Sequence, residues 1–244
     1  MQLWAAQIID AARVVIMPTR RITRSPVKVT GTVPDGQVFE STLEEDFFTL
    51  LRFNRLIESF EAQPVTVEWL DDAKKIRTYT PDVLVRYRKD LQESANLSPV
   101  LCEVKPDFNE ASKSPRRRGP PRTENSTENE QKWAAARVFA ARRGWEFKVV
   151  RESEIRTPYL ANVRFLLRYV ERDVESRYES ALLAVLVEHS VLSLEAWAGQ
   201  LSKSLEERAK LLPTCYRLIA LQTVVADLKA PLTLNTLIKA RGNV

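Results

Sequence analysis

The spacing of apolar residues changes several times along the chain, and each change predicts a new helix or strand. Ser41 stands in an N-cap position with Glu44 three residues later, which is the spacing of a capping box. A helix is therefore predicted from Ser41 to about Phe60, followed by a two-residue alternation over 65–80 with a polar turn at 71–74. The predicted buried face of this helix consists of Leu43, Phe47, Leu50, Leu51 and Ile57.

Two more strands, a helix and a last strand complete the predicted first domain. Residues 81–87 and 99–105 have the composition of strands. Residues 128–142 carry apolar positions at helical spacing and are followed by Gly144, a residue typical of helix ends. Residues 145–150 predict another strand. This order predicts an α/β fold in which a mixed sheet is flanked by helices.

The rest of the chain predicts a second, smaller domain. Residues 156–172 form a predicted helical bridge, and Ser193 is the predicted cap of a later helix. Pro213 falls within the last helical stretch, so a break or a later helix start is predicted there. Three helices and a hairpin are the pattern of a winged helix, although a helical interaction module without DNA contact fits as well. The predicted helices are 178–189, 194–201 and 205–221, and the predicted hairpin covers 223–234.

Composition and charge exclude several classes of function. Lys and Arg outnumber Asp and Glu by 37 to 32, and the net charge of +5 suits a nucleic-acid partner without requiring one. The two cysteines, Cys102 and Cys215, form no disulfide framework, so a reducing cytoplasm is the expected location. No apolar stretch approaches the ~20 residues of a membrane span, and Asp10 and Arg13 interrupt any signal-peptide core. With His189 as the single histidine, zinc sites of the Cys/His kind are excluded and carboxylate and metal chemistry is favoured.

The predicted strand 99–105 ends in a Glu-x-Lys sequence that favours a metal site. Because side chains alternate along a strand, Glu103 and Lys105 share one face while Val104 packs behind it. Asp82, Glu103 and the carbonyl oxygen of Val104 supply hard oxygen ligands, which favours Mg²⁺, with Mn²⁺ expected to substitute. Lys105 can orient a water nucleophile or stabilise charge on a phosphate.

Glu44 is the predicted fourth group of this site, in preference to Glu45 and Asp46, which point in other directions. A Glu-x-Lys pair alone is common on exposed strands, where it is a surface ion pair. Pro-Asp, a short gap and Glu-x-Lys at the end of a hydrophobic strand, behind a Glu-bearing helix, are together the PD-(D/E)xK nuclease pattern. The sequence therefore favours a metal-dependent nuclease.

Several neighbouring residues have both a functional and a structural interpretation. Residues 106–127 are rich in proline and arginine, and they are predicted as a flexible loop or as a basic flap over a phosphate backbone. Gln131 and Lys132 could reach the site, but a solvated helix face is the favoured prediction. Trp133 and Trp145 are predicted as core residues rather than base-stacking groups. Cys102 is a predicted buried, inert thiol. The candidate DNA-binding residues of the insertion are Arg116, Arg117, Arg118 and Arg122.

Four sequence blocks resemble a narrower family. The chain is similar, over about residues 25–170, to the TnsA endonucleases, which are the nuclease subunits of heteromeric transposases. A Gly144-Trp145 pair before a strand and Glu154-Ile155-Arg156 after it also resemble that family. The blocks come in the order and spacing of the family and are Glu40–Phe47, Phe60–Pro64, Tyr79–Asp82 and Glu103–Pro106.

The resemblance implies a restriction-endonuclease-like core and a role in cut-and-paste DNA transposition. TnsA-type proteins cleave the 5′ strands at transposon ends, a TnsB-type transposase processes the 3′ strands, and a TnsC-type ATPase regulator contacts the smaller C-terminal domain. The active site carried over from the family is Glu44, Asp82, Glu103 and Lys105. Family members vary between Glu and Gln at the position of Glu103, and the insertion after Lys105 departs from the family pattern.

The resulting predicted domains are residues 1–30 as an N-terminal helix and basic arm, 31–172 as the nuclease domain, and 173–244 as a winged-helix-like partner-binding domain. The expected location is the bacterial cytoplasm, at the nucleoid when the protein acts. Two other functions remain open at this point. One is a stand-alone repair or restriction nuclease, and the other is a catalytically inert DNA-binding or assembly subunit of a transposition complex.

Overall fold

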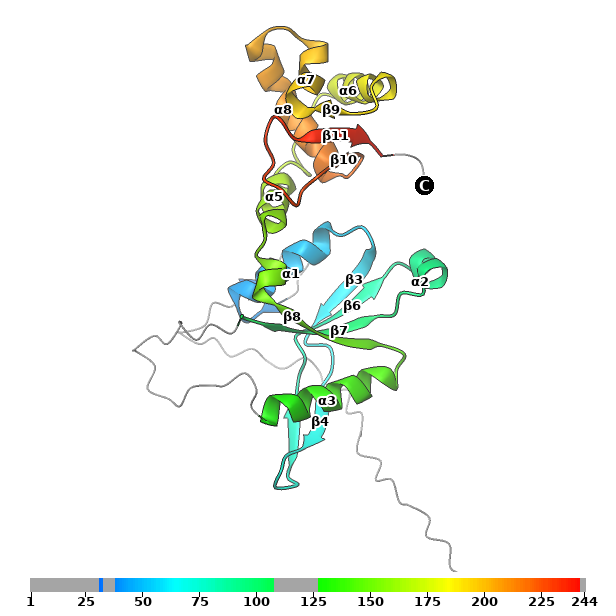
Figure 1. Ribbon diagram of the computed structural model, residues 1–244, viewed down its shortest axis with the longest axis vertical. Helices are drawn as coiled ribbons and strands as arrows, with labels where there is room; N and C mark the ends of the chain where they lie inside the picture. Colours follow the sequence, from blue (N-terminus) through cyan, green and yellow to red (C-terminus); the bar gives the residue numbers. More distant parts are fainter. Residues whose placement is uncertain (1–30, 33–37, 108–126, 242–244) are drawn as a thin grey trace, which may run out of the picture. The chain divides into compact units, whose positions relative to one another are not determined.

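The computed structural model describes residues 31–32, 38–107 and 127–241, which fall into two compact units. The first unit ends at Ile155 and the second begins at Arg156 (Figure 1). Within these described ranges, none of the helices combines the length and the apolar character that crossing a membrane requires. Each unit has a sheet and helices of its own and is described separately below.

A four-stranded mixed sheet is the centre of the first unit. Its strands lie in the order β3-β6-β7-β8, with antiparallel pairing of β3 with β6 and of β6 with β7, and parallel pairing of β7 with β8. This confirms the predicted α/β class with a mixed sheet. The strands are β3 (Ile57–Ala62), β6 (Val83–Tyr87), β7 (Val100–Lys105) and β8 (Glu146–Arg151).

The alternating segment over 65–80, with its polar turn, forms a hairpin, and this hairpin is a two-stranded sheet separate from the central one. Strands β4 (Val67–Leu70) and β5 (Ile76–Tyr79) are antiparallel and lie beside helix α3 (Thr127–Ala141) (Figure 1). Two short strands, β1 (Gly31–Thr32) and β2 (Val38–Phe39), form a further antiparallel pair. The hairpin, α3 and the sheet share one apolar cluster, formed by Val67, Trp69, Tyr79, Leu84, Leu101, Trp133, Ala136, Phe139 and Ala140.

Helix α1 (Thr42–Phe53) is shorter than predicted. Ser41 caps it as expected, since its side chain accepts a hydrogen bond from the backbone N–H of Glu44. The prediction that the helix continues to about Phe60 is wrong, because Asn54 turns into an extended conformation and the following residues pair with β6 as strand β3. Ile57 therefore belongs to the sheet. The buried residues of α1 are Leu43, Asp46, Phe48, Thr49, Leu51 and Phe53, with Phe47 and Leu50 half-buried.

Helices α1 and α3 lie on opposite sides of the central sheet (Figure 1). On the α1 side, the rings of Phe48 and Phe60 are 5.1 Å apart between centroids. Helix α3 ends close to Gly144, whose φ of 67° is a left-handed conformation that favours glycine, as the sequence predicted. The two short helices of this unit are α2 (Lys89–Ala95), which was not predicted, and α4 (Glu152–Ile155).

The second unit consists of four helices and a three-stranded antiparallel sheet in the order β10-β11-β9. Its helices are α5 (Pro158–Leu167), α6 (Ser176–Glu188), α7 (Leu194–Leu201) and α8 (Leu205–Ala220). Its strands are β9 (Leu192–Ser193), β10 (Val224–Ala226) and β11 (Leu237–Ala240). Strand β11 begins beyond the predicted hairpin range, which ended at residue 234.

Helix α5 is fixed within the second unit through Asn162. The buried side-chain amide of this residue donates hydrogen bonds to the carbonyls of Leu228 (2.8 Å) and Ala230 (2.7 Å), and its oxygen accepts one from the backbone N–H of Leu232 (3.0 Å). Because a buried amide is costly to leave unpaired, these bonds tie α5 to the segment after β10. The compact unit thus includes part of the segment that the sequence analysis assigned to the nuclease domain.

The prediction of a break at Pro213 is wrong, since α8 runs through it without interruption. Proline removes one backbone N–H and costs about 3 kcal/mol within a helix. In α8 this cost is offset by tertiary burial on both sides of the proline. The buried residues of the helix are Leu211, Thr214, Cys215, Leu218, Ile219 and Ala220.

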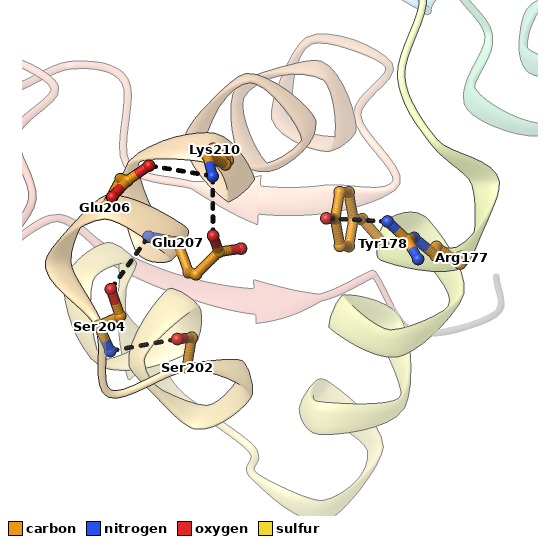
Figure 2. Close-up of polar contacts among 7 residues, drawn as sticks. All are labelled: Arg177, Tyr178, Ser202, Ser204, Glu206, Glu207 and Lys210. Carbon is orange, nitrogen blue, oxygen red and sulfur yellow. Dashed lines mark hydrogen bonds and ion pairs between the residues drawn. The ribbon is translucent and has the colours of Figure 1, made fainter.

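Polar contacts fix the beginning of α8 (Figure 2). Ser204 is the N-cap and accepts a hydrogen bond from the backbone N–H of Glu207, while Ser202 accepts one from the backbone N–H of Ser204. The Lys210 ammonium lies 2.8 Å from a carboxylate oxygen of Glu207 and 3.2 Å from one of Glu206. The first turn of α8 therefore carries two carboxylates, which suit the positive end of a helix dipole.

Candidate active site

The predicted site residues come together where β7 ends and β6 begins. Asp82 directly precedes β6, and its backbone N–H donates a hydrogen bond to the carbonyl of Cys102 (3.1 Å). Its own carbonyl accepts one from the backbone N–H of Gln63 (2.8 Å). Since Glu103 and Lys105 are the last residues of β7 on this side, the antiparallel pairing of β6 with β7 places both next to Asp82.

Glu103 is the most buried group of the site, with 3% of its side chain exposed. One carboxylate oxygen, Oε1, lies 2.6 Å from the ammonium of Lys105 and 3.7 Å from that of Lys132. The other, Oε2, accepts a hydrogen bond of 2.5 Å from the hydroxyl of Tyr79. Both oxygens are therefore bound by protein groups, which is what a buried carboxylate requires.

The Asp82 carboxylate is held by the backbone of β7. Its Oδ2 accepts a hydrogen bond of 2.6 Å from the N–H of Val104. Burial raises the pKa of Asp82 well above its usual value, and the negative charges of Glu103 and Glu44 raise it further, while Lys105 opposes the shift. The surroundings of Asp82 therefore do not supply enough positive charge to stabilise its ionised carboxylate.

Glu44 is positioned by the beginning of α1. Its carboxylate accepts hydrogen bonds of 2.9 Å from the backbone N–H of Glu40 and from the hydroxyl of Ser41. Burial raises the pKa of Glu44, although these two hydrogen bonds and the charge of Lys105 act in the opposite direction. These hydrogen bonds hold the Glu44 carboxylate in a position where the charge of Lys105 still acts on it.

The two lysines of the site respond differently to burial. For Lys105, burial disfavours the ammonium, but the charges of Glu103 and Asp82 outweigh it, so that its pKa is raised. For Lys132, burial wins and the pKa is lowered, with Glu103 opposing the shift and Lys105 adding to it. The ammonium of Lys132 also lies 5.0 Å from the centre of the Tyr79 ring, a cation–π distance.

In the part of the chain that the structure describes, no group of three or more Asp, Glu, His or Cys side chains is arranged to hold a metal ion. The carboxylates of Glu44, Asp82 and Glu103 instead bind to protein donors. The predicted metal ligands, which include the Val104 carbonyl, therefore remain predictions. The described geometry is that of a buried, hydrogen-bonded cluster of three acids and two lysines.

A comparison with protein families decides the assignment. Residues 54–152 match the family model described as the TnsA-like endonuclease N-terminal domain. By sequence, this segment is a TnsA-like endonuclease domain. The matched range contains Asp82, Glu103 and Lys105, whereas Glu44 lies before it. The family belongs to the PD-(D/E)xK superfamily. No curated protein matches the chain.

The site contains Tyr79, which was not predicted, and Lys132, for which a solvated helix face was the favoured prediction over contact with the site. Lys132 does not lie on a solvated face, because it contacts the buried Glu103. The signal was present in the helical spacing, since Lys132, Ala136 and Ala140 are four residues apart and the two alanines are fully buried. Tyr79 stands in the block that leads to Asp82, but nothing in the alternation pattern identifies its hydroxyl as a partner of Glu103.

The other candidate residues of the sequence analysis have structural roles, contact other parts of the chain or lie outside the described residues. Trp133 is buried and Trp145 half-buried, with the Trp145 ring 6.5 Å from that of Phe139. Cys102 is a buried thiol, and burial raises its pKa to about 12. Gln131 donates a hydrogen bond to Asp72 rather than to the site. The predicted DNA-binding residues Arg116, Arg117, Arg118 and Arg122 lie outside the described residues.

Replacing Tyr79 with Phe should slow cleavage without weakening DNA binding. The change removes the hydroxyl that orients Glu103, and loss of such an outer partner of a reacting group typically costs about 10–100-fold in activity. Because Tyr79 is buried, KM for DNA should stay within about twofold of the wild-type value. Steady-state kinetics of Tyr79→Phe, with Tyr87→Phe on strand β6 as the matched control, measure this. An unchanged kcat for Tyr79→Phe would contradict the role of the hydroxyl.

Proposed function

We propose that the chain is the nuclease subunit of a heteromeric transposase and hydrolyses the 5′, non-transferred strands at transposon ends. The family assignment gives a nuclease role in transposition. The observation that carries the proposal for this chain is the position of Asp82, Glu103 and Lys105, three polar groups packed together at the end of β7 inside the family domain. An ion pair on an exposed strand is solvated, whereas the Glu103 side chain is buried, so a surface ion pair does not explain this cluster.

The oxygen chemistry of this cluster suits a divalent cation of the Mg²⁺ type, although binding would require the carboxylates to turn from their present protein donors. Asp82, Glu44 and Glu103 offer oxygen ligands. Burial raises the pKa of Asp82 and Glu44 because it disfavours their ionised forms, and a bound cation would stabilise those forms. Asp82 and Glu44 would hold the ion, with Glu103 and the Val104 carbonyl as further ligands. When bound, the ion supplies Lewis acidity and lowers the pKa of a coordinated water. Mn²⁺ offers a similar ligand preference and is the proposed substitute.

The protein groups have separate tasks in the proposed reaction. The backbone N–H of Val104 fixes the carboxylate of Asp82, and the hydroxyl of Tyr79 fixes that of Glu103. Lys105 keeps its ammonium charged beside these acids, so it can stabilise the negative charge that develops on a phosphate under attack. About one third of the Lys105 side chain is exposed, which leaves it accessible to DNA.

We propose that the second unit, with its helices and small antiparallel sheet, is a winged-helix-like module that binds protein partners. In such modules the third helix reads DNA, and in the proposed module of α6, α7 and α8 that helix would be α8. Its first turn carries Glu206 and Glu207, whose carboxylates repel phosphates and are paired with Lys210 (Figure 2). The proposed partners of the chain are a TnsB-type transposase at the DNA ends and a TnsC-type ATPase for this unit.

Partner dependence separates this proposal from the two alternatives. Cleavage of transposon-end DNA should be measured with Mg²⁺ for the full chain alone and with the TnsB-type and TnsC-type proteins of the same element. The proposal expects 5′-strand cuts at the ends when the partners are present. Efficient cutting of unrelated duplexes by the chain alone would favour a stand-alone nuclease. Absence of 5′-strand cuts in the complete mixture, with 3′ processing intact, would favour an inert assembly subunit.

A further inference from the structure

Lys132 is a second cation in the active site that the proposed reaction does not yet use. The Oε1 atom of Glu103 already has a close ion pair with Lys105 at 2.6 Å. Lys132 approaches the same oxygen only to 3.7 Å, near the outer limit of an ion pair. Oε1 of Glu103 is thus paired with two ammonium groups. The more distant one, that of Lys132, is held less tightly and can more easily pair with another anion.

The position of Lys132 is fixed from a different element than that of Lys105. Lys132 extends from α3, whereas Lys105 belongs to β7, so the two ammonium groups reach Glu103 from separate parts of the fold. The Tyr79 ring lies 5.0 Å from the Lys132 ammonium and keeps it beside the site. The Lys132 side chain is 18% exposed, between the 3% of Glu103 and the 32% of Lys105, so solvent still reaches it.

The charges of the cluster leave a place for one anion. The three carboxylates of Glu44, Asp82 and Glu103 and the two ammonium groups of Lys105 and Lys132 sum to −1 when all are ionised. A divalent cation changes the sum to +1, and one phosphodiester then makes the loaded site neutral. Without Lys132 the same loaded site would carry −1 in a buried setting, which is unfavourable.

We propose that Lys132 is a phosphate-binding residue, whose ammonium leaves Glu103 and binds a non-bridging oxygen of a DNA phosphodiester at or next to the bond that is cut. The ligand class is a phosphodiester of the DNA backbone, and the inference rests on the proposed nuclease function. Lys105 then keeps its ion pair with Glu103 and its proposed role at the phosphate under attack, while Lys132 provides an additional contact with the DNA backbone. The structural alternative is that Lys132 only neutralises Glu103 and never touches DNA.

A chemical double-mutant cycle distinguishes these roles through binding, without cleavage. Full-length protein with its partner transposase is titrated with transposon-end duplexes in Ca²⁺, which supports binding in place of Mg²⁺. Each duplex carries one neutral methylphosphonate at a phosphate near the cut. Lys132→Gln and the relevant methylphosphonate should each weaken binding about tenfold, the effect of one charge-assisted hydrogen bond, and their combination should weaken it no further.

Three further variants make the result unambiguous. Lys132→Met keeps the aliphatic stem over Tyr79 without its charge and should behave like Lys132→Gln, so that a folding defect in one variant does not decide the outcome. Lys132→Arg should retain the response to the methylphosphonate. Lys148→Gln removes an exposed lysine that is paired with Glu154 in the same unit and should bind like wild type.

The inference and the proposed function fail in distinguishable ways. If wild type cuts the ends but Lys132→Gln and Lys132→Met bind every duplex as wild type does, the phosphate contact is wrong and the nuclease function stands. The phosphate contact is also wrong if the combined variant and methylphosphonate weaken binding by the product of their two separate fold-changes, because the two changes then act independently. If the wild-type protein neither binds nor cuts transposon ends with its partners, both are overturned.

Discussion

Replacing Asp82 with Asn should abolish most DNA cleavage and, at the same time, stabilise the metal-free protein at neutral pH. Asn can still accept the hydrogen bond from the Val104 N–H, so the local geometry is retained. It cannot supply the negative charge that a divalent cation requires, and loss of one electrostatic group at a reacting phosphate costs on the order of 10²–10³-fold in rate. Cleavage and stability therefore change in opposite directions.

The gain in stability follows from the raised pKa of Asp82. Well below the usual pKa of 3.8, the carboxyl is protonated in the folded and the unfolded chain, and its ionisation costs no stability. As the pH rises through the raised pKa of the folded state, the unfolded chain has already released its proton, so the folded state loses stability relative to it. Asn does not titrate and avoids this loss.

Thermal unfolding in EDTA, from a pH below the usual aspartate pKa of 3.8 to mildly alkaline pH, measures the effect. The melting temperatures of wild type and Asp82→Asn should be similar at the acidic end, and the variant should become the more stable protein as the pH rises. Asp72→Asn, on the turn of the hairpin, is an exposed control. A variant that is less stable than wild type at neutral pH would show that Asp82 is well compensated without a metal.

Replacing Trp197 with Ala should unfold the second unit while the first keeps its structure. Trp197 is fully buried, and its indole N–H donates a hydrogen bond of 2.8 Å to the carbonyl of Leu182. Removing so large a buried side chain costs about 3–5 kcal/mol, which is comparable to the whole stability of a small domain. Trp197→Phe keeps most of the volume and loses only the hydrogen bond, so it should cost about 1–2 kcal/mol.

Hydrogen–deuterium exchange resolved by peptide tests this difference. In Trp197→Ala, peptides from residues 156–241 should lose protection, and peptides from β6, β7 and α3 should keep it, because the two units have separate cores. Protection lost equally in both units would contradict separate cores. If the second unit binds the TnsC-type ATPase and the first unit is a metal-dependent nuclease, as proposed, this variant should not respond to the ATPase, while the first unit keeps the proposed cleavage activity.

Several regular elements of the first unit could be predicted from sequence because local rules specify them. Ser41 and Glu44 specify the start of α1, and the alternation around the turn at 71–74 specifies the hairpin. The end of α1 could not be predicted, because residues 57–60 continue an apolar pattern that fits helix and strand equally. Their pairing with β6, a contact with a distant segment, decides between them.

The site divides in the same way. That Glu103 and Lys105 share one face follows from strand alternation and was predictable, and Asp82 was identified by the Pro-Asp sequence before the neighbouring strand. The contacts of Tyr79 and Lys132 with Glu103 depend on how the hairpin and α3 pack on the sheet, which local spacing does not contain. Pro213 shows the opposite case, in which a strong local rule is outweighed by burial of the residues around it.

The most direct test of the central claim is strand-resolved cleavage of transposon-end DNA, with each strand labelled separately, in Mg²⁺ and with the partner transposase. Wild type is compared with Asp82→Ala and Lys105→Ala, and with Lys148→Ala as a control outside the site. If the chain is the 5′-strand nuclease, 5′-end cuts vanish in the two site variants and persist in the control, while 3′-end processing continues in all. If both site variants cut the 5′ ends like wild type, the assigned active site is wrong.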